Sequence, residues 1–285
     1  MTMDTEELLA RYAAGERDFR EAKLASANLA NQNLKGANLR RADLRRANLQ
    51  GALLEGANLR EAVLTEANLE FAKLHLVNLI SADLTDANLS GADLTDAGMR
   101  SVNLLRTQIR QAKLQEANLN EANLDSANLR QADLSNVSLS RAKMLGTDLT
   151  EAMLDGANLT SAILNGAVLA SASMIACVLS GASLEGADLR SVDLNRARLK
   201  GANLVNANLT QANLRSANLS WSSFRGANLR GVTLYRAKLS WSNFSGAILT
   251  EAVMINANIE YTNLKNADLT GAILPDGVTR SAPDL

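Results

Sequence analysis

The sequence predicts an all-β fold in which the chain winds into a closed coil with four sides, and two periods indicate it. Every fifth residue from Phe19 to Leu274 is large and apolar, and 43 of these 52 residues are Leu. A longer period of twenty relates the segment 220–224, SWSSF, to the segment 240–244, SWSNF. Because twenty residues contain four repeats of five, one turn of the coil has four sides.

The period of five excludes ordinary helices and flat sheets. In an α-helix, a step of five residues turns about 500°, which scatters the leucines around the axis. In a straight strand, an odd period sends successive leucines to opposite faces. A chain that bends once per repeat instead keeps each leucine inside the coil, together with the small residue two positions before it. That small residue is Ala in 39 repeats, and only Arg17 and Gln32 are large.

The period of twenty predicts which residues are neighbours in successive coils. Trp221, Trp241 and Tyr261 follow one another at this step and are expected to form one row. A second row contains only Gly and Asn, which tolerate a positive φ at a corner. Its members are Gly146, Gly166, Gly186, Asn206, Gly226, Gly246 and Asn266.

The repeat reads Ala, then Asn or Asp, then Leu, then two variable residues, as at 27–29 and 92–94. It resembles the pentapeptide-repeat family over residues 17–276. The resemblance implies a right-handed quadrilateral β-helix, a pentapeptide-repeat solenoid of about 13 coils. The leader LLARYAAGERDF resembles leaders of bacterial members of the family, particularly cyanobacterial ones.

Three regions are expected: an N-terminal cap at 1–16, the β-helix of 52 repeats at 17–276, and a flexible C-terminal tail at 277–285. Residues 4–14 are predicted to form the capping helix, with Asp4 as N-cap and Glu7 as its capping-box partner. Residues 277–285 are too short and polar to cover the other end. The last coil is therefore open, or paired with a second copy of the chain.

Composition and charge limit the expected partners and cellular location of the protein. The formal charge of −1 gives no global field that would attract nucleic acid or an acidic membrane, so nucleic acid is not an expected partner. One cysteine cannot form an internal disulfide, and the N-terminus shows no secretory signal, so we expect a cytoplasmic location. No apolar run is long enough to span a membrane.

Two surface groups are candidate interaction surfaces. The first is a basic cluster, whose members are Arg40, Arg41, Arg45, Arg46 and Arg60. It is either a solvated face screened by Glu21 and Glu61 or a patch for an acidic partner. The second is the row of Trp221, Trp241 and Tyr261, which is either a structural ladder or an interaction surface. Outer positions also become apolar between 153 and 178, at Met153, Ile163, Val168, Ile175 and Val178, on different sides of the coil.

The sequence carries no catalytic pattern. His75 is the only histidine and falls at an outward position, so a histidine-based triad or metal site has no second member. Cys177 occupies a small inward position, which favours an inert buried thiol. We expect no enzyme activity, no cofactor, no bound metal and no small-molecule substrate.

The function that fits these patterns is a non-catalytic structural or protein-interaction rod, a scaffold whose partner is a protein. One alternative comes from the family resemblance, which implies that some members mimic DNA and bind type II topoisomerases. Such mimicry needs a strongly negative surface, whereas the repeats at both ends are mildly basic here. Another alternative is peripheral association with a membrane or photosynthetic complex.

Overall fold

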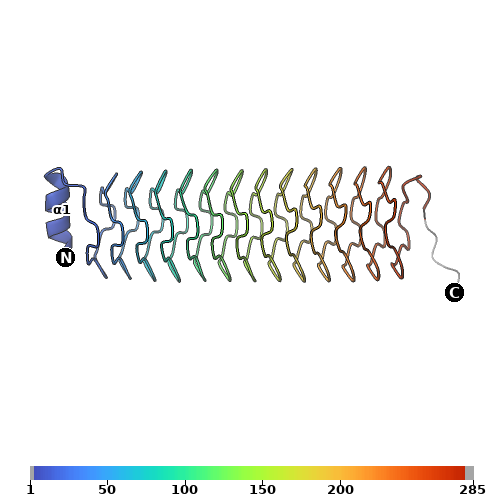
Figure 1. Cartoon of the computed structure of the whole chain (residues 1–285), viewed down its shortest axis with the longest axis horizontal. Helices are drawn as coiled ribbons and strands as arrows, with labels where there is room; N and C mark the ends of the chain where they lie inside the picture. Colours follow the sequence, from blue (N-terminus) through green and yellow to red (C-terminus); the bar gives the residue numbers. More distant parts are fainter. Residues whose placement is uncertain (1–2, 280–285) are drawn as a thin grey trace. The chain divides into compact units, whose positions relative to one another are not determined.

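The computed structural model describes residues 3–279. The chain divides into two compact units, Met1–Lys143 and Met144–Leu285. Each unit is a stack of coils of the same kind, and the N-terminal unit also carries the helix α1, Thr5–Ala13 (Figure 1). The predicted repeat solenoid is therefore present within each unit.

Neighbouring coils are joined by parallel backbone pairing at a step of twenty residues. In the N-terminal unit, for example, Lys23 is bridged to Asp43. The amide of Leu24 donates to the carbonyl of Asp43 at 2.7 Å, and the amide of Asp43 donates back to the carbonyl of Ala22 at 2.9 Å. Each coil thus finds its hydrogen-bond partners in the coils before and after it, which satisfies backbone groups that a curved chain would otherwise expose.

Within the described residues, the paired segments are single bridged residues rather than longer strands. The reason is the turn that closes every repeat. The amide of Ala22 donates to the carbonyl of Phe19 at 3.2 Å, and the intervening Glu21 has a φ of 59°. Two of every five residues are central residues of such a turn, so little extended chain remains between corners.

The second of these turn residues has a left-handed backbone throughout both units. The predicted corner row of Gly and Asn is confirmed, with φ from 56° at Asn206 to 66° at Gly226 and Gly246. Many other residues share this conformation, including Trp221 at 64°. A left-handed backbone costs a residue with a Cβ about 1 kcal/mol or more. The regular hydrogen bonding between coils therefore holds most of these residues in a conformation that is intrinsically unfavourable for them.

The inside of each coil is filled as the repeat predicts. Leu124 and Ala127 are each 1% exposed, and the same alternation of leucine and alanine continues through both units. In the C-terminal unit, the rings of Phe224 and Phe244 stack in the core, 4.5 Å between centroids. Buried Thr107 replaces an alanine and donates its hydroxyl to the carbonyl of Leu84 at 2.8 Å.

The frequent Asn or Asp before each leucine stabilises the turn and the stack together. The Oδ1 of Asn48 accepts from the amide of Gln50 at 3.2 Å. Its Nδ2 donates to the Oδ1 of Asn28, one coil away, at 3.1 Å. An asparagine can do both because its amide carries an acceptor and a donor, whereas an ionised aspartate can only accept.

The helix α1 lies at the N-terminal end of its stack of coils (Figure 1). Asp4 is its N-cap and accepts from the amide of Glu7 at 2.8 Å, as expected. Leu8 is fully buried, and the hydroxyl of Tyr12 donates to the carbonyl of Lys35 at 3.0 Å. Met3, which the sequence did not indicate, is also buried. These contacts fasten the helix to the coils beside it.

The last coil of the C-terminal unit is less covered than the others. Ile259, Leu264 and Leu269 occupy positions that are buried in earlier coils, yet all three are partly exposed. The segment after Pro275 turns back, so that Thr279 pairs antiparallel with Ile273. Most of the predicted flexible tail, residues 280–285, lies outside the described residues.

Candidate functional site

The basic cluster of the N-terminal unit is held together by carboxylates. Glu61 lies at its centre, 2.6 Å from the Nε of Arg41, 2.9 Å from the Nε of Arg60 and 3.4 Å from the Nη2 of Arg40. Glu21 lies 4.0 Å from Arg41 on the other side. The screening carboxylates that the sequence indicated are therefore in contact with these arginines.

These guanidinium groups change the acidity of Glu61. The hydrogen bond from Arg41, together with the charges of Arg40 and Arg41 and a hydrogen bond from Arg60, holds the pKa of Glu61 at about 2. Glu61 is thus ionised across the physiological range. Three arginines share one carboxylate, and a second carboxylate, Glu21, stands beside them.

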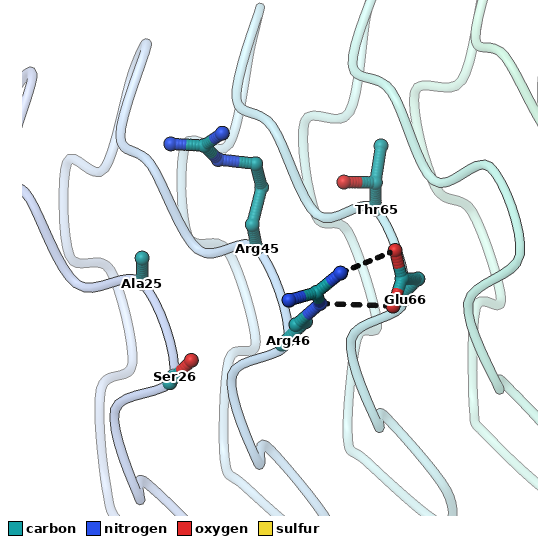
Figure 2. Close-up of a pocket in the computed structure, with 6 residues that line it drawn as sticks. All are labelled: Ala25, Ser26, Arg45, Arg46, Thr65 and Glu66. Carbon is teal, nitrogen blue, oxygen red and sulfur yellow. Dashed lines mark hydrogen bonds and ion pairs between the residues drawn. The ribbon is translucent and has the colours of Figure 1, made fainter.

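The other two arginines of the cluster are also ion-paired. Arg45 makes a two-pronged pair with Asp43, at 2.8 and 2.7 Å. Arg46 makes one with Glu66 of the next coil, at 2.9 and 3.3 Å (Figure 2). Both arginines line a hollow of about 330 Å³, together with Ala25, Ser26, Thr65 and Glu66. The guanidinium groups of Arg45 and Arg46 already have carboxylate partners, so an anion that entered the hollow would compete with Asp43 and Glu66.

The aromatic row forms a continuous stack in the C-terminal unit. The rings of Trp221 and Trp241 lie 5.1 Å apart and 5° from parallel, and those of Trp241 and Tyr261 lie 4.4 Å apart and 18° from parallel. The three residues are nevertheless 59%, 50% and 73% exposed. The stack therefore orders three large side chains on the outside of the coil.

The wall beneath the row fixes its position. Trp221 and Trp241 stand at left-handed corners, and the amide of Trp221 donates to the carbonyl of Ser240 at 3.1 Å. One coil before Trp221, the same row holds Gly201, where a Cβ would meet nothing within 4 Å. One face of Trp221 is covered by Trp241, and on the other side the row continues with Gly201, which has no side chain.

Cations of the C-terminal unit form a further group that the sequence reasoning did not single out. Residues 194–250 contain eight basic side chains and no carboxylate. The sequence signal of this group is the long absence of Asp and Glu between residues 194 and 250.

Cys177 and His75 were the two residues of potentially reactive type, and they lie in different surroundings. Cys177 is fully buried, and burial raises the pKa of its thiol to about 12. The Nδ1 of His75 lies 3.1 Å from the carbonyl of Thr95 in the next coil. Among residues 3–279, no group of three or more His, Cys, Asp or Glu could hold a metal ion. No helix in that range is both long and apolar enough to cross a membrane.

Several of the apolar residues predicted at outer positions of the C-terminal unit are exposed, but they do not form one patch. Met153, Ile163 and Ile175 are exposed, and Leu145, which the sequence reasoning did not name, is exposed as well. Since 145, 153, 163 and 175 differ from one another by steps other than twenty, they belong to different rows, and single exposed apolar residues are common on protein surfaces.

A coil of this repeat, with an ordered outer wall and a closed apolar interior, defines a repeat solenoid. The family model described as pentapeptide repeats (8 copies) matches the chain over residues 18–51, 42–79, 78–116, 117–154, 152–190, 193–231 and 234–274. The protein belongs to the pentapeptide-repeat family.

Several solved structures of pentapeptide-repeat proteins resemble the chain. HetL of the cyanobacterium Nostoc sp. strain PCC 7120, described as involved in the regulation of heterocyst differentiation, is 32% identical, with 98% of this chain and 100% of HetL covered and a TM-score of 0.26. Rfr23 of the cyanobacterium Cyanothece 51142 is 35% identical over 42% of this chain and 58% of its own, with a TM-score of 0.17.

QnrB1, a plasmid-mediated fluoroquinolone resistance protein, is 17% identical over 56% of this chain and 83% of its own, with a TM-score of 0.33. The TM-scores are low, so the family assignment rests on the repeat model. No curated protein matches the chain.

Proposed function

We propose that this protein is a non-catalytic scaffold that binds protein partners on the outer wall of its coils. The observation that carries the proposal is the aromatic row, because Trp221, Trp241 and Tyr261 expose half or more of their surface while stacking holds them in place. Trp, Tyr and Arg dominate the energetics of protein interfaces, and side chains that are ordered beforehand lose less entropy on binding.

The basic cluster is a second proposed surface, for an acidic partner. Its arginines hold carboxylates already, so the partner would have to replace Glu61, Asp43 or Glu66 as the counter-ion. Exchange of one ion pair for another gives little net affinity, whereas it can fix the orientation of a complex. The aromatic row is therefore the stronger of the two proposed surfaces.

Affinity capture tests the proposal. Tagged full-length protein is incubated with lysate of its native source at low and high salt, and retained proteins are quantified by mass spectrometry. We expect one stoichiometric partner that is lost when Trp241 and Tyr261 are replaced by Ser. A matched control, Phe71→Ser, removes an exposed aromatic side chain from the other unit and should leave capture unchanged. Absence of any stoichiometric partner at either salt concentration would overturn the scaffold proposal.

A variant with Arg40, Arg41, Arg45 and Arg46 replaced by Gln examines the basic cluster in the same experiment. Loss of a salt-sensitive partner would assign docking to that surface, and retention would remove the cluster from the proposal.

Mimicry of DNA and association with a membrane complex have no comparable support. Duplex DNA carries a dense, uniform negative charge. Residues 194–250 carry eight cations and no carboxylate, which is the opposite of what a mimic needs. Capture of a topoisomerase in the experiment above would reverse this judgement.

We also propose that the coils are right-handed, number about 13 and run from residue 17 to 276, as the 52 repeats suggest. The lone cysteine suits a reducing compartment, and we propose the cytoplasm as the location. A second copy of the chain is a proposed partner at the last coil, where Ile259, Leu264 and Leu269 are partly exposed. Light scattering of purified protein checks this dimer, and a crystal structure checks the hand and the coil number.

A further inference from the structure

One side of the C-terminal unit gathers six exposed cations next to the aromatic row, and we call it the basic face. Its members are Arg196, Arg198, Lys200, Arg215, Arg236 and Lys238. Successive bridges join Arg198 to Asn218 and Asn218 to Lys238, and the amide of Arg196 donates to the carbonyl of Arg215 at 2.9 Å. Arg198 and Lys238 therefore lie on one wall, Arg196, Arg215 and Arg236 on the corner that precedes it, and Lys200 on the corner that follows it, all on adjoining coils.

The cations of the basic face differ from those of the basic cluster in their partners. In the part of the chain that the structure describes, none of the six makes an ion pair with a carboxylate. The one additional contact is that of Arg236, whose guanidinium lies 5.0 Å from the centroid of the Tyr235 ring. Neighbouring coils lie about 4.8 Å apart, which is less than a Debye length at physiological salt, so cations on adjoining coils add to a local positive potential that the net charge of the chain conceals.

The corner that follows the basic face carries the aromatic row. Lys200 is followed directly by Gly201, and the amide of Gly201 donates to the carbonyl of Ser220, which precedes Trp221. The open position over Gly201 thus adjoins Lys200 on one side and the free face of Trp221 on the other. We call this position the shelf; it is a place for one apolar side chain beside a group of cations.

We propose that the basic face binds an acidic segment of a protein partner, with one apolar or aromatic side chain of that segment seated on the shelf against Trp221. The proposal rests on the scaffold function proposed above and specifies the chemistry of the partner. Carboxylates of the segment would meet Arg198, Lys200 and Lys238, which have no carboxylate partner among residues 3–279, so binding does not require an ion pair of that part of the chain to break.

The ring geometry favours protein over single-stranded nucleic acid at this face. Bases bind to proteins by stacking on free aromatic faces. In the row, Trp241 is covered on both faces by its neighbours, so at most the two outer faces of the stack are left, one on Trp221 and one on Tyr261. A nucleic acid would find two separate stacking platforms at opposite ends of the row rather than a run of successive ones, whereas a protein segment can pack on ring edges and fill one shelf.

Peptide binding to the full-length chain tests the proposal. The probe is a fluorescein-labelled peptide of Asp, Glu, Leu and Phe, followed by anisotropy, and the tryptophan emission is recorded together with it. The chain has two tryptophans, and both lie in the aromatic row, so their emission reports on this surface alone. We expect saturable binding that changes the emission and weakens with salt.

Matched variants separate the basic face from general charge. Replacement of Arg198, Lys200 and Lys238 by Ser should weaken binding by about tenfold or more. The control replaces Arg190, Arg225 and Arg230 by Ser, which removes the same charge from other sides of the same unit and should change affinity by less than about threefold. Equal weakening by both triple variants would overturn the proposal.

A second pair of variants examines the shelf. Gly201→Tyr should fold, since Tyr261 occupies the same row with a φ of 55° and Gly201 has a φ of 69°. Its ring would stack on Trp221, close the shelf and weaken binding. Gly246→Tyr, at an equally open corner of another row, is the control and should bind as the wild type does. Unchanged binding to Gly201→Tyr would remove the shelf from the proposal.

Two further outcomes would overturn the inference. One is tighter binding of an oligothymidine strand than of the acidic peptide, and the other is no peptide binding at all. The affinity capture can also be repeated with the variant in which Arg198, Lys200 and Lys238 are replaced by Ser. If that variant still captures the partner, the scaffold function stands, but the assignment of the partner to the basic face fails.

Discussion

The rings of Trp221 and Trp241 lie 5.1 Å apart and 5° from parallel, although both residues are exposed and twenty positions separate them in the chain. The distance between the rings follows the spacing of neighbouring strands, which is about 4.8 Å. Backbone pairing therefore sets the stack, and the aromatic contact adds to it. This relationship makes the row a rigid feature of the wall.

Removing a ring from the row should cost less stability than removing one from the core. We expect Trp241→Ser to lower the free energy of unfolding by about 1–3 kcal/mol, because Trp241 belongs to two stacked pairs and each contributes about 0.5–1.5 kcal/mol beyond its burial. The exciton signal of the paired indoles in near-ultraviolet circular dichroism should disappear. Phe244→Ala, which opens a hole in the core beside Phe224, should cost about 3–5 kcal/mol. Equal losses for the two variants would contradict the placement of Trp241 on the outside.

Inside the coil, replacing a side chain by a smaller or a larger one should lower the free energy of unfolding. Leu124→Ala leaves a cavity and should lower the free energy of unfolding by about 2–5 kcal/mol. Ala127→Leu forces extra carbon atoms into a filled corner and should cost about 1–3 kcal/mol. Chemical denaturation followed by circular dichroism measures both, and wild-type midpoints for the two variants would refute the assignment of these positions to the core.

Acid should selectively weaken the basic cluster. The pKa of Glu61 is lowered to about 2, so ionised Glu61 stabilises the fold above the ordinary glutamate pKa near 4.5. That contribution should be lost as the pH falls from about 4.5 through about 2. We expect Glu61→Gln to lower the denaturation midpoint at pH 7 and to have little effect at pH 2. A difference that does not change over this range would show that the ion pairs contribute nothing measurable.

Two glycine corners should respond differently to an added methyl group. At Gly146, with a φ of 60°, a Cβ would meet nothing within 4 Å, so Gly146→Ala should cost about 1 kcal/mol from backbone strain alone. At Gly91, a Cβ would lie 2.5 Å from the ring of Phe71, which must move away. Gly91→Ala should therefore cost more. In the background of Phe71→Ser the cost at Gly91 should fall to that at Gly146, which a double-mutant cycle measures.

The thiol of Cys177 should be unreactive in the folded protein. Burial raises its pKa to about 12, and the thiolate is the reactive form. We expect no labelling by a thiol reagent in native buffer and complete labelling in denaturant. Rapid labelling of the native protein would place Cys177 on the outside of its coil.

The sequence predicted the features that follow directly from period. Leucines at every fifth position must lie inside, and residues twenty apart must be neighbours, so the core and the row of Trp221, Trp241 and Tyr261 could be located. The Asn and Asp that precede each leucine could be counted, yet their bonds to the next coil depend on side-chain geometry that a period does not contain. Arg17 breaks the small-residue rule, and its contacts explain why. Its guanidinium lies 3.8 Å from the centroid of the Tyr12 ring and donates to the carbonyls of Tyr12 and Glu16 at 2.8 and 2.7 Å.

Charge was harder to predict than packing. The basic cluster could be recognised because most of its residues are close in sequence, but the ion pairs of Arg40 and Arg41 with Glu61 come from the next coil. The cations of the basic face are spread over forty residues and meet only through the stacking of coils. Sequence proximity is a poor guide to electrostatics in a fold where the nearest neighbour in space is twenty residues away.

The two periods also set a rule for insertions and deletions. Removing five residues, for example 227–231, would keep every later leucine inside, because the core repeats every five residues. It would nevertheless carry Trp241 to the next side of the coil, away from Trp221. Removing twenty residues would instead shorten the stack by one layer and leave every row in line. A change of five residues therefore keeps the leucine pattern of the core, whereas the rows of the outer wall, and the core stack of Phe224 and Phe244, survive only changes of a whole layer.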